Sequence, residues 1–491
     1  MSLFISSKGM KKQTPRNRRK PEFSKPEPER PKRARPTAGQ ILDLSVAALD
    51  EEGYGLAIQE AARVLVFGAL PGETVRARVT FAGRQDIFAD LVKVLRHSPD
   101  RLSTPPCNRG NQCDGCPLIR MKYSAQLEWK RGLVEGAVRR YPSLRAAEIL
   151  PVTPSAKPLG YRTTAKLVIS GRFAAPVIGI YRRNSHHVMD ITDCPLHHPL
   201  INRVISAVRE GIVKGKAPIY SPRTGSGILR YLVVRVSEQD NRAMVTFVTA
   251  ARSFNEIHHL ARYLQEAVPE VAVVVQNVNA SAGNVILGEK DYFVTREQTL
   301  TDSIGGIRFS ISPRSFFQVN NEGARAIYET VREWAELTGT ETVADVYCGV
   351  GGISLFLASQ AEQVIGIESV AAAVADAERN ARLNGIRNTL FIAGDAAELL
   401  GDLHDEGKEV NLVVLNPPRK GCDEGVLRSV AALGPGRIIY ASCSPRTLAR
   451  DLDILAGLGY RTIRIRPVDM FPQTTHVENV ALLAKQPSSS G

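Results

Sequence analysis

Two side chains near the C-terminal end of the chain have types and positions that suit chemistry. Cys443 follows the apolar run RIIYAS and precedes Ser444-Pro445, which is typical of a strand that ends where a helix begins. A thiol at a helix N-terminus is favoured as thiolate, the nucleophilic form of cysteine. A cysteine that ends a buried strand is more often a small core residue, and Glu478 taken alone would be interpreted as solvent-exposed. Neither residue establishes an enzyme by itself.

A second set of residues suits a nucleotide-like ligand. The run ETVADV leads into Tyr347-Cys348-Gly349-Val350-Gly351-Gly352 and then into an apolar, helix-like run. Glycines between a strand and a helix bring backbone N–H groups close to a ligand. Glu368 ends the next run, VIGIE, where a carboxylate suits two ribose hydroxyls, and Asp395 follows the third run and suits adenine. These features fit S-adenosyl-L-methionine and NAD about equally, although the third glycine of a dinucleotide motif is missing.

The cysteines form a third set. The chain has seven, and an odd number in a large chain argues against a disulfide framework. Cys107, Cys113 and Cys116 follow the spacing C-x5-C-x2-C, and Cys194 lies much later in the run DCPL. Four thiolates suit zinc or an iron–sulfur cluster, and the spacing alone does not choose between them.

The composition is that of an ordinary soluble globular protein, with 43% hydrophobic and 23% charged residues. No apolar run approaches the length of about 18 residues that spans a membrane, and the N-terminus lacks a signal-peptide core. We therefore expect a cytoplasmic protein without membrane contact. Residues 1–40 hold 12 Lys/Arg against 3 Glu, or +9 of the net charge of +13. This proline-rich segment, which we assign to a disordered tail over residues 1–39, is either solubilising or a tether for phosphates.

The elements that must position these residues fall into three predicted domains. Residues 40–97 show short alternating runs between glycine turns, which predicts a small OB-like β-barrel. Residues 98–311 hold the four cysteines of the third set, a helix near 123–141 that packs on the last domain, and a mixed α+β region. From residue 312 to 491 strands and helices alternate, which predicts a parallel doubly wound, Rossmann-like sheet. We expect its strands at 341–346, 364–368, 389–393, 410–416, 437–442, 460–466 and 477–484, and a helix at 369–384.

Together these motifs resemble the RNA uridine-5 methyltransferase family. The matching residues are Ser315-Phe316-Phe317-Gln318-Val319-Asn320, Asp345-x-Tyr347-Cys348-Gly349, Asn416-Pro417-Pro418-Arg419, Ser442-Cys443, Met470-Phe471-Pro472 and His476-Val477-Glu478. The segments EEGYGLA and FGALPGE resemble the TRAM domain, an OB-like RNA-binding barrel. The resemblance spans almost all of residues 40–485.

The resemblance implies methyl transfer from S-adenosyl-L-methionine to C5 of a uridine in RNA. Cys443 would be the covalent nucleophile and Glu478 the base, while Gln318, Tyr347, Glu368 and Asp395 would line the methyl-donor pocket together with the glycine turn. The chemistry fits independently, because C5 of uracil becomes carbanion-like only when a thiolate adds to C6. A base must then remove the C5 proton, so that the cysteine can leave.

The pattern also predicts residues that contact the substrate RNA. Many family members carry Asp where this chain has Asn416, whose amide can bind uracil N3–H and O4 but cannot act as a base. We assign Asn416, which also borders the donor pocket, and Arg419 to substrate RNA. Arg162 and Lys166, in YRTTAK, resemble a segment rich in RNA contacts, although both suit an exposed strand face equally well.

Family members with this cysteine spacing hold a 4Fe-4S cluster, so the resemblance implies a structural cluster on the four cysteines. The TRAM-like segment, the cluster and Asn416 favour 23S ribosomal RNA as the substrate, with the T loop of tRNA as the alternative. We expect a monomer. An RNA cytosine-5 methyltransferase would need a Pro-Cys nucleophile or a Thr-Cys pair, whereas Pro417-Pro418 lacks the first and Ser442-Cys443 alters the second. A non-catalytic RNA-binding factor would have no need of both Cys443 and Glu478.

Overall fold

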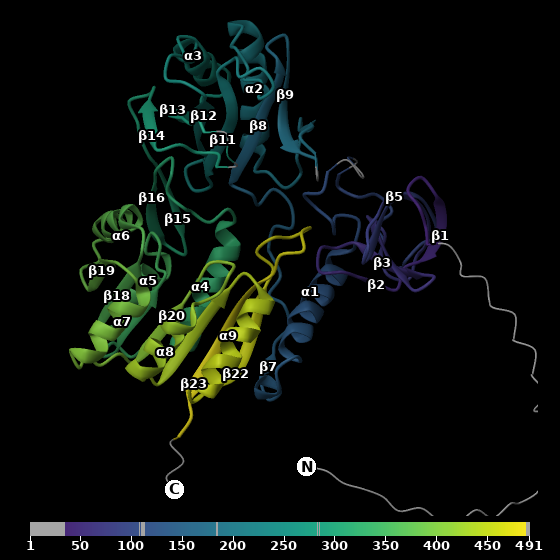
Figure 1. Ribbon diagram of the computed structural model, residues 1–491. Helices are drawn as coiled ribbons and strands as arrows, with labels where there is room; N and C mark the ends of the chain where they lie inside the picture. The colour runs from purple at the N-terminus through teal and green to yellow at the C-terminus, as the bar shows by residue number, and fades with distance from the viewer. Residues whose placement is uncertain are drawn as a thin grey trace, which may run out of the picture.

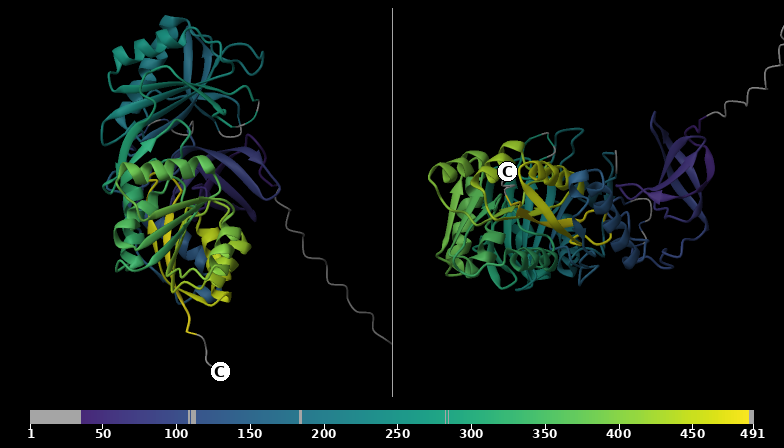
Figure 2. Two further views of the ribbon diagram at one scale, coloured as in Figure 1. Left: turned by 90° about the vertical axis from the view of Figure 1, so that its left-hand side faces the viewer. Right: turned by 90° about the horizontal axis from the view of Figure 1, so that it is seen from below.

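The computed structural model describes residues 35–487 apart from 108, 110–112, 183–184, 282 and 284, so nearly all of the predicted basic tail lies outside the described residues. Three sheet-containing parts are visible in Figure 1: a small sheet at one side, a central sheet above and a large sheet below. Figure 2 shows the central and large parts stacked end to end, with the small sheet beside them. No helix of the described part is long and apolar enough to cross a membrane.

The elements have the following bounds. The strands are β1 (Ile41–Ser45), β2 (Ala48–Leu49), β3 (Gly55–Gln59), β4 (Ala62–Phe67), β5 (Thr74–Ala82), β6 (Asp86–Arg96), β7 (Glu148–Ile149), β8 (Thr164–Arg172), β9 (Ala175–Tyr181), β10 (Val188–Asp190), β11 (Leu229–Ser237), β12 (Arg242–Thr249), β13 (Val271–Val278), β14 (Lys290–Phe293), β15 (Leu300–Ile304), β16 (Ile307–Ile311), β17 (Thr342–Val346), β18 (Gln363–Glu368), β19 (Thr389–Ala393), β20 (Leu412–Leu415), β21 (Arg437–Ser442), β22 (Tyr460–Val468) and β23 (Glu478–Lys485). The helices are α1 (Tyr123–Val138), α2 (Pro199–Gly215), α3 (Ile257–Ala267), α4 (Asn321–Ala335), α5 (Gly352–Leu357), α6 (Ala371–Leu383), α7 (Ala396–Asp405), α8 (Glu424–Leu433) and α9 (Pro445–Gly457), with short 3-10 turns at Pro142–Leu144 and Ala358–Gln360.

The small sheet has the strand order β1-β5-β6-β4-β3-β2. Strands β1 and β5 alternate between buried and exposed side chains, which is typical of a sheet with one covered face. A buried ion pair joins the sheet to the cysteine-bearing segment that follows it, because Arg101 Nε lies 2.5 Å from Glu73 Oε1. This pair fixes the start of that segment against the sheet.

The central sheet has the order β10-β9-β8-β11-β12-β13-β14. Helices α2 and α3 pack together over one face, where apolar side chains from β8, β11 and β12 form a core with them. Side chains on the opposite face, including Met244, Val273 and Val275, pack instead with the core of the large sheet. The central part is therefore joined to the large part by a continuous apolar contact.

The large sheet has the order β19-β18-β17-β20-β21-β23-β22-β7. Strands β17 to β21 are parallel, as predicted for a doubly wound sheet, whereas β23 lies antiparallel between β21 and β22. One face is covered by α4, α5 and α6, and the other by α1, α7, α8 and α9. All seven predicted strands and the helix predicted at 369–384 are confirmed to within about three residues at each end.

The core does not divide at residue 312, where the sequence analysis places a boundary. Helix α1 packs against α9, and β7 extends the large sheet by pairing in parallel with β22. The hairpin β15–β16 likewise contributes Leu300 and Phe309 to the core of the large part. The sequence analysis predicts the helix near 123–141 and its packing on the last domain, but it predicts no individual strands at 148–149 or 300–311, because a short periodic run does not indicate which sheet it joins.

Candidate active site

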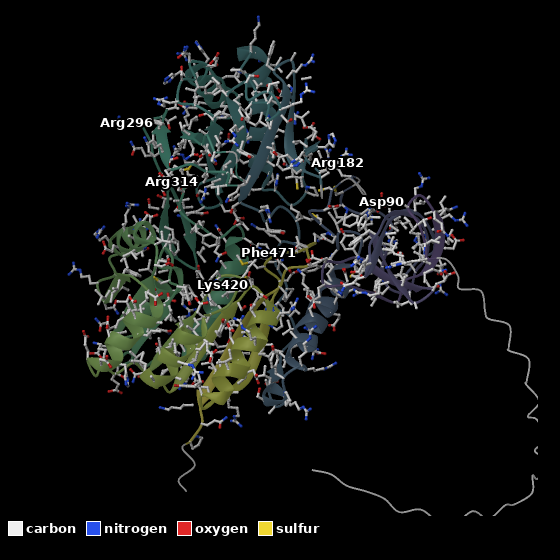
Figure 3. All side chains as sticks on the ribbon, in the orientation of Figure 1. Asp90, Arg182, Arg296, Arg314, Lys420 and Phe471 are labelled. Carbon is white, nitrogen blue, oxygen red and sulfur yellow. The ribbon has the colours of Figure 1, made fainter. Side chains whose placement is uncertain are left out.

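A cavity of about 1770 Å³ lies at the carboxyl edge of the large sheet, where open α/β sheets bind their ligands. Ten of the residues predicted from the sequence line it: Gln318, Tyr347, Gly349, Gly352, Glu368, Asp395, Asn416, Arg419, Cys443 and Glu478. Arg314, Lys420 and Phe471 are also among its lining residues, and Figure 3 shows them where the large sheet faces the central part. Gly351, Arg162, Lys166 and the four predicted cluster cysteines do not line the cavity.

The glycine turn after β17 has a backbone that few residue types could adopt. Gly349 and Gly351 have φ of +55° and +83°, and Tyr347 has φ of +66°, a left-handed conformation that is costly for an aromatic residue. A side chain at position 352 would collide with the hydroxyl of Tyr328. Strain of this kind persists where the surrounding structure enforces it, and it is common at ligand sites. The turn is therefore built for close approach of a ligand.

Glu368 and Asp395 stand at the next two strand tips but have different partners. The carboxylate of Glu368 accepts hydrogen bonds from the N–H of Gly349 at 3.1 Å and of Val370 at 2.9 Å. Asp395 caps α7 and accepts from the N–H groups of Ala397 and Glu398. Glu368 is thus tied directly to the glycine turn, whereas Asp395 combines helix capping with its place on the cavity wall.

Cys443 and Glu478 come from neighbouring strands. Cys443 directly follows β21, Glu478 begins β23, and these strands pair with Ser442 opposite Asn479. Burial raises the pKa of Glu478 to about 7, and the positive charge of Arg419 opposes this shift. The pKa of the Cys443 thiol is raised, first by burial and then by the charge of Glu478, while Arg419 lowers it. The charge of Glu478 therefore acts on Cys443, and both groups have Arg419 as a positive neighbour.

The direction of the thiol pKa differs from the sequence expectation. The helix after Cys443 is present, with Ser444 as its N-cap, and the hydroxyl of Ser444 accepts from the N–H of Thr447. The helix terminus was expected to favour thiolate, but removal of the thiol from water has the larger effect. Arg419 is the group that favours the thiolate in this cavity.

Asp345 is a cavity residue to which the sequence reasoning assigned no role. Its Oδ2 accepts a hydrogen bond from Ser354 Oγ at 2.5 Å, and Oδ1 has no hydrogen-bond partner among the described residues. Burial raises the pKa of this carboxyl to about 7. The signal for Asp345 in the sequence was its position in the motif, two residues before Tyr347. Phe471 and His476, whose rings lie edge to face at 5.9 Å, line the cavity beside Glu478 and were likewise noted only as motif residues.

The four predicted cluster cysteines gather outside the cavity. All four are free and partly buried. The pKa values of Cys113 and Cys116 are raised, first by burial and then by the charges of the other cysteines, and Cys194 acts on both. The thiols thus lie within electrostatic reach of one another. In the part of the chain that the structure describes, no group of three or more His, Cys, Asp or Glu side chains is arranged to hold a single metal ion.

The two predicted RNA-contacting cations lie on neighbouring parts of the central region. Lys166 is exposed on β8, and Arg162 precedes that strand and forms a backbone bridge with His197. The Nε of Arg162 is buried without a hydrogen-bond partner among the described residues. Neither side chain reaches the cavity, so an RNA contact there would involve nucleotides outside it.

Comparison with known proteins gives consistent matches over most of the chain. The sequence model of the family described as tRNA (Uracil-5-)-methyltransferase matches residues 230–486. An uncharacterized RNA methyltransferase of Geobacter sulfurreducens is 63% identical over 448 residues, which cover 91% of this chain and 90% of that protein. Another from Halalkalibacterium halodurans is 38% identical over 443 residues, covering 90% and 96%.

A solved structure matches most of the chain. The crystal structure of Pyrococcus abyssi tRNA (uracil-54, C5)-methyltransferase, in complex with S-adenosyl-L-homocysteine, superposes with a TM-score of 0.73 at 26% identity. The match covers 90% of this chain and 100% of that chain. The similarity therefore includes the small and central sheets as well as the large one.

Proposed function

The chain belongs to the tRNA (uracil-5-)-methyltransferase family of RNA methyltransferases, and we propose that it transfers a methyl group from S-adenosyl-L-methionine to C5 of a uridine in RNA. The observation that carries this proposal is the meeting of Cys443 and Glu478 in one cavity with the strained glycine turn and Glu368. A nucleophile, a base and a nucleotide-like site are the three parts that the reaction needs.

The residues at the glycine turn fit the methyl donor, which supplies an electrophilic methyl group when bound. Gly349 and Gly351 allow close backbone approach, and the carboxylate of Glu368 suits the ribose hydroxyls. Asp395 would lie at the adenine, with Gln318 and Tyr347 completing the wall. The matching Pyrococcus abyssi structure holds the demethylated product of this donor, which supports the assignment.

Cys443 would act first. Its thiolate, favoured by Arg419, forms a bond with C6 of uracil, and the electrons of the C5–C6 double bond move toward O4 to give an enolate. C5 would then form a bond to the methyl carbon as the bond between that carbon and the sulfur of the donor breaks, so that S-adenosyl-L-homocysteine leaves. Asn416, on the same cavity wall, can accept from N3–H and donate to O4, which orients the ring for these steps.

Glu478 would complete the reaction. The carboxylate removes the C5 proton, and the C5–H electron pair restores the double bond while Cys443 leaves as thiolate. A pKa of about 7 places this base near the pH at which it must work, and a positioned base contributes on the order of 10²–10⁴-fold to rate.

The substrate we propose is a uridine of 23S ribosomal RNA, as the TRAM-like segment, the cysteine set and Asn416 indicate. A uridine in the T loop of tRNA is the second candidate, favoured by the activity named for the matching Pyrococcus abyssi structure. Mass-spectrometric mapping of 5-methyluridine in both RNAs, from cells with and without this protein, decides between them. Loss of the modification from tRNA alone would reject the ribosomal assignment.

We further propose that Cys107, Cys113, Cys116 and Cys194 hold a structural 4Fe-4S cluster. Four free thiols that sense one another's charge supply the four thiolate ligands that such a cluster takes. Anaerobically purified protein should contain about four iron and four sulfide per chain. Stoichiometric zinc without sulfide would refute the proposal.

The central test of the mechanism is Cys443→Ala. This variant should lose methyl transfer while it binds S-adenosyl-L-methionine almost normally, because other residues form the donor pocket. RNA containing 5-fluorouridine should trap the wild-type enzyme covalently, since fluorine at C5 cannot be removed as a proton. Cys422→Ala should still be trapped and Cys443→Ala should not. Appreciable turnover by Cys443→Ala would refute the proposed mechanism.

A further inference from the structure

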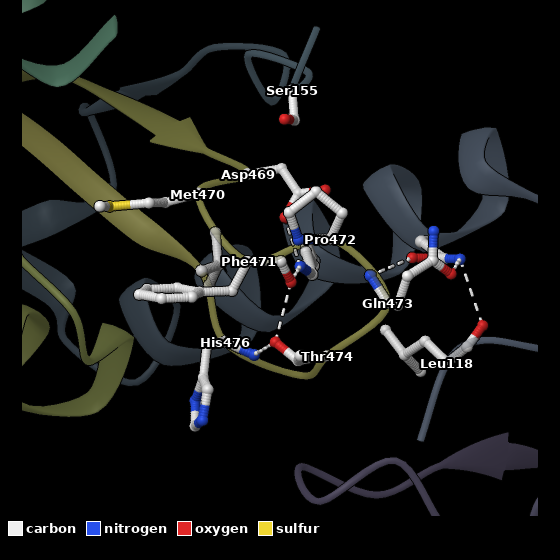
Figure 4. Close-up of polar contacts among 12 residues, drawn as sticks. Leu118, Ser155, Asp469, Met470, Phe471, Pro472, Gln473, Thr474 and His476 are labelled. Atoms are coloured by element: carbon white, nitrogen blue, oxygen red, sulfur yellow. Dashed lines mark hydrogen bonds and ion pairs between the residues drawn. The ribbon is translucent and has the colours of Figure 1, made fainter. Parts of the chain in front are cut away.

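The loop at residues 469–476 connects β22 to β23 and leads into Glu478 (Figure 4). It is well buried for a hairpin connection, with Asp469, Met470, Gln473 and Thr474 among the buried residues. Phe471 and His476, near its two ends, line the cavity. The loop therefore forms the part of the active-site wall that lies next to the proposed base.

Lys130 of α1 holds this loop from outside the sheet. Its side chain is fully buried, and its Nζ donates to Asp469 Oδ1 at 2.5 Å and to the carbonyl oxygen of Phe471 at 3.0 Å. Burial lowers the pKa of Lys130, and the charge of Asp469 opposes that shift. A fully buried lysine is rare unless it is paired, and removal of one partner from such a pair is strongly destabilising.

The same carbonyl connects Lys130 to the cavity wall. Thr474 Oγ1 also donates to the carbonyl of Phe471, at 2.8 Å, and accepts from the backbone N–H of His476 at 3.3 Å. Figure 4 shows these contacts between Phe471, Thr474 and His476. A displacement of the Phe471 carbonyl would therefore be transmitted to His476, two residues before Glu478.

Gln126, one helical turn before Lys130, forms a second anchor. Its Nε2 donates to Gln473 Oε1 at 2.9 Å, and its Oε1 accepts from the backbone N–H of Gln473 at 3.0 Å. Gln473 has φ of +69°, a left-handed conformation that is unfavourable for glutamine. The paired amides supply the interactions that hold the loop in this conformation.

We propose that Lys130 and Gln126 are positioning residues for the proton-removal step: by fixing loop 469–476 they hold Phe471 and His476 as the wall against which Glu478 faces the methylated uracil. The inference rests on the proposed function, because it assumes that Glu478 is the base. Neither residue touches the cavity, so both act through the loop. Misplacement of a catalytic group by about 1 Å can cost on the order of 100-fold in rate.

The experiment compares Lys130→Met with Lys122→Met, a matched change of an exposed lysine at the start of the same helix. Substrate RNA and S-adenosyl-L-methionine are mixed with excess enzyme, and denaturation-resistant protein–RNA adduct and released methylated RNA are followed over time. Lys130→Met should form the adduct but release product on the order of 10- to 100-fold more slowly, so that the adduct accumulates. Lys122→Met should release product at the wild-type rate. Donor affinity should be unchanged in both.

Two further variants separate positioning from stability. Lys130→Met/Asp469→Asn removes the unpaired buried charge and should recover melting temperature, yet it should still accumulate adduct because the bond to the Phe471 carbonyl is missing. Gln126→Met tests the second anchor independently, and it decides the question if the Lys130 variants fail to fold. Release at the wild-type rate by a folded Lys130 variant or by Gln126→Met, alongside adduct accumulation in Glu478→Gln, would overturn the inference alone. Normal release by Glu478→Gln would instead refute the proposed base.

Discussion

Two loops line the same cavity, but different parts of the chain hold them. Loop 416–422 follows β20 and is held by α9, the helix that begins just after Cys443. Loop 469–476 precedes β23 and is held by α1, where Lys130 and Asp469 are 339 positions apart in the sequence. The first wall is thus built within the large sheet and its own helices, whereas the second depends on a helix that the chain forms before the central sheet.

The anchor of loop 416–422 is compact and local. Asp451 Oδ2 accepts from the N–H of Cys422 at 2.8 Å and from Tyr440 Oη at 2.5 Å, and Arg450 pairs with the same carboxylate. Gly421 has φ of +79°, and a Cβ there would approach Asp451 Oδ2 to 2.5 Å. Thr447 Oγ1 adds a contact to the carbonyl of Arg419 at 3.3 Å. This wall carries Asn416 and Arg419, which are assigned to uracil and to the thiolate.

Because their anchors differ, the two loops would serve different steps of the proposed reaction. Loop 416–422 would serve the early steps, in which uracil is oriented and Cys443 adds, and loop 469–476 would serve the late step, in which Glu478 removes the proton. A change in the first loop should therefore reduce adduct formation, whereas a change in the second should lengthen the lifetime of the adduct.

The largest expected effect is that of Glu478→Gln. Turnover should fall by roughly 10²–10⁴-fold because the base is absent, while addition of Cys443 and methyl transfer continue. A denaturation-resistant protein–RNA adduct should accumulate and can be measured by gel electrophoresis with labelled RNA. Glu424→Gln, at an exposed glutamate on α8, should turn over at the wild-type rate. Normal turnover by Glu478→Gln would show that another group removes the proton.

The next expected effect is a pH dependence of the free energy of unfolding, which arises from Glu478 next to loop 469–476. The folded-state pKa of Glu478 is raised from 4.5 to about 7, so the folded state binds the proton more tightly than the unfolded state. The associated stability is fully present below about pH 4.5 and is lost as pH rises through about 7. Solvent in the cavity screens part of this energy, so the loss should be about 2–3 kcal/mol.

Urea denaturation of wild type and Glu478→Gln between pH 4.5 and 8 measures this loss. The free energy of unfolding of wild type should fall relative to that of the variant as pH rises, because glutamine does not ionise. A constant difference across this range would contradict the raised pKa. Product release by wild type should accelerate over the same range, since only the carboxylate can accept the proton.

The smallest expected effect is that of a change at Asp451, which anchors loop 416–422. Asp451→Asn should lower the free energy of unfolding by about 1–2 kcal/mol, because buried donors lose a charged acceptor. Adduct formation should slow through displacement of Arg419, but adduct should not accumulate, in contrast to Lys130→Met. Asp405→Asn, at an exposed aspartate on α7, serves as the matched control. Accumulation of adduct in Asp451→Asn would abolish the distinction between the two loops.

The sequence by itself predicted the features that depend on local pattern. Apolar runs separated by glycine and proline located the strands of the large sheet other than β7, and their parallel order implied that the glycine turn, Asn416 and Cys443 meet at one edge. Motif resemblance predicted the family, which the comparisons confirm. The mixed α/β fold is also confirmed, whereas the roles of individual residues, the cluster and the target RNA stay predictions.

Only the tertiary structure decided what depends on neighbours distant in sequence. Nothing in the run around Lys130 distinguishes it from an exposed lysine, because its burial is stabilised by Asp469 near the other end of the chain. The thiol of Cys443 was expected to be acidic from its helix, yet its pKa is raised because burial and Glu478 act on it in the folded state. Desolvation and charge pairing are properties of the packed neighbourhood. A periodic pattern in the sequence indicates which face of a helix or strand is buried, but not which element packs against that face.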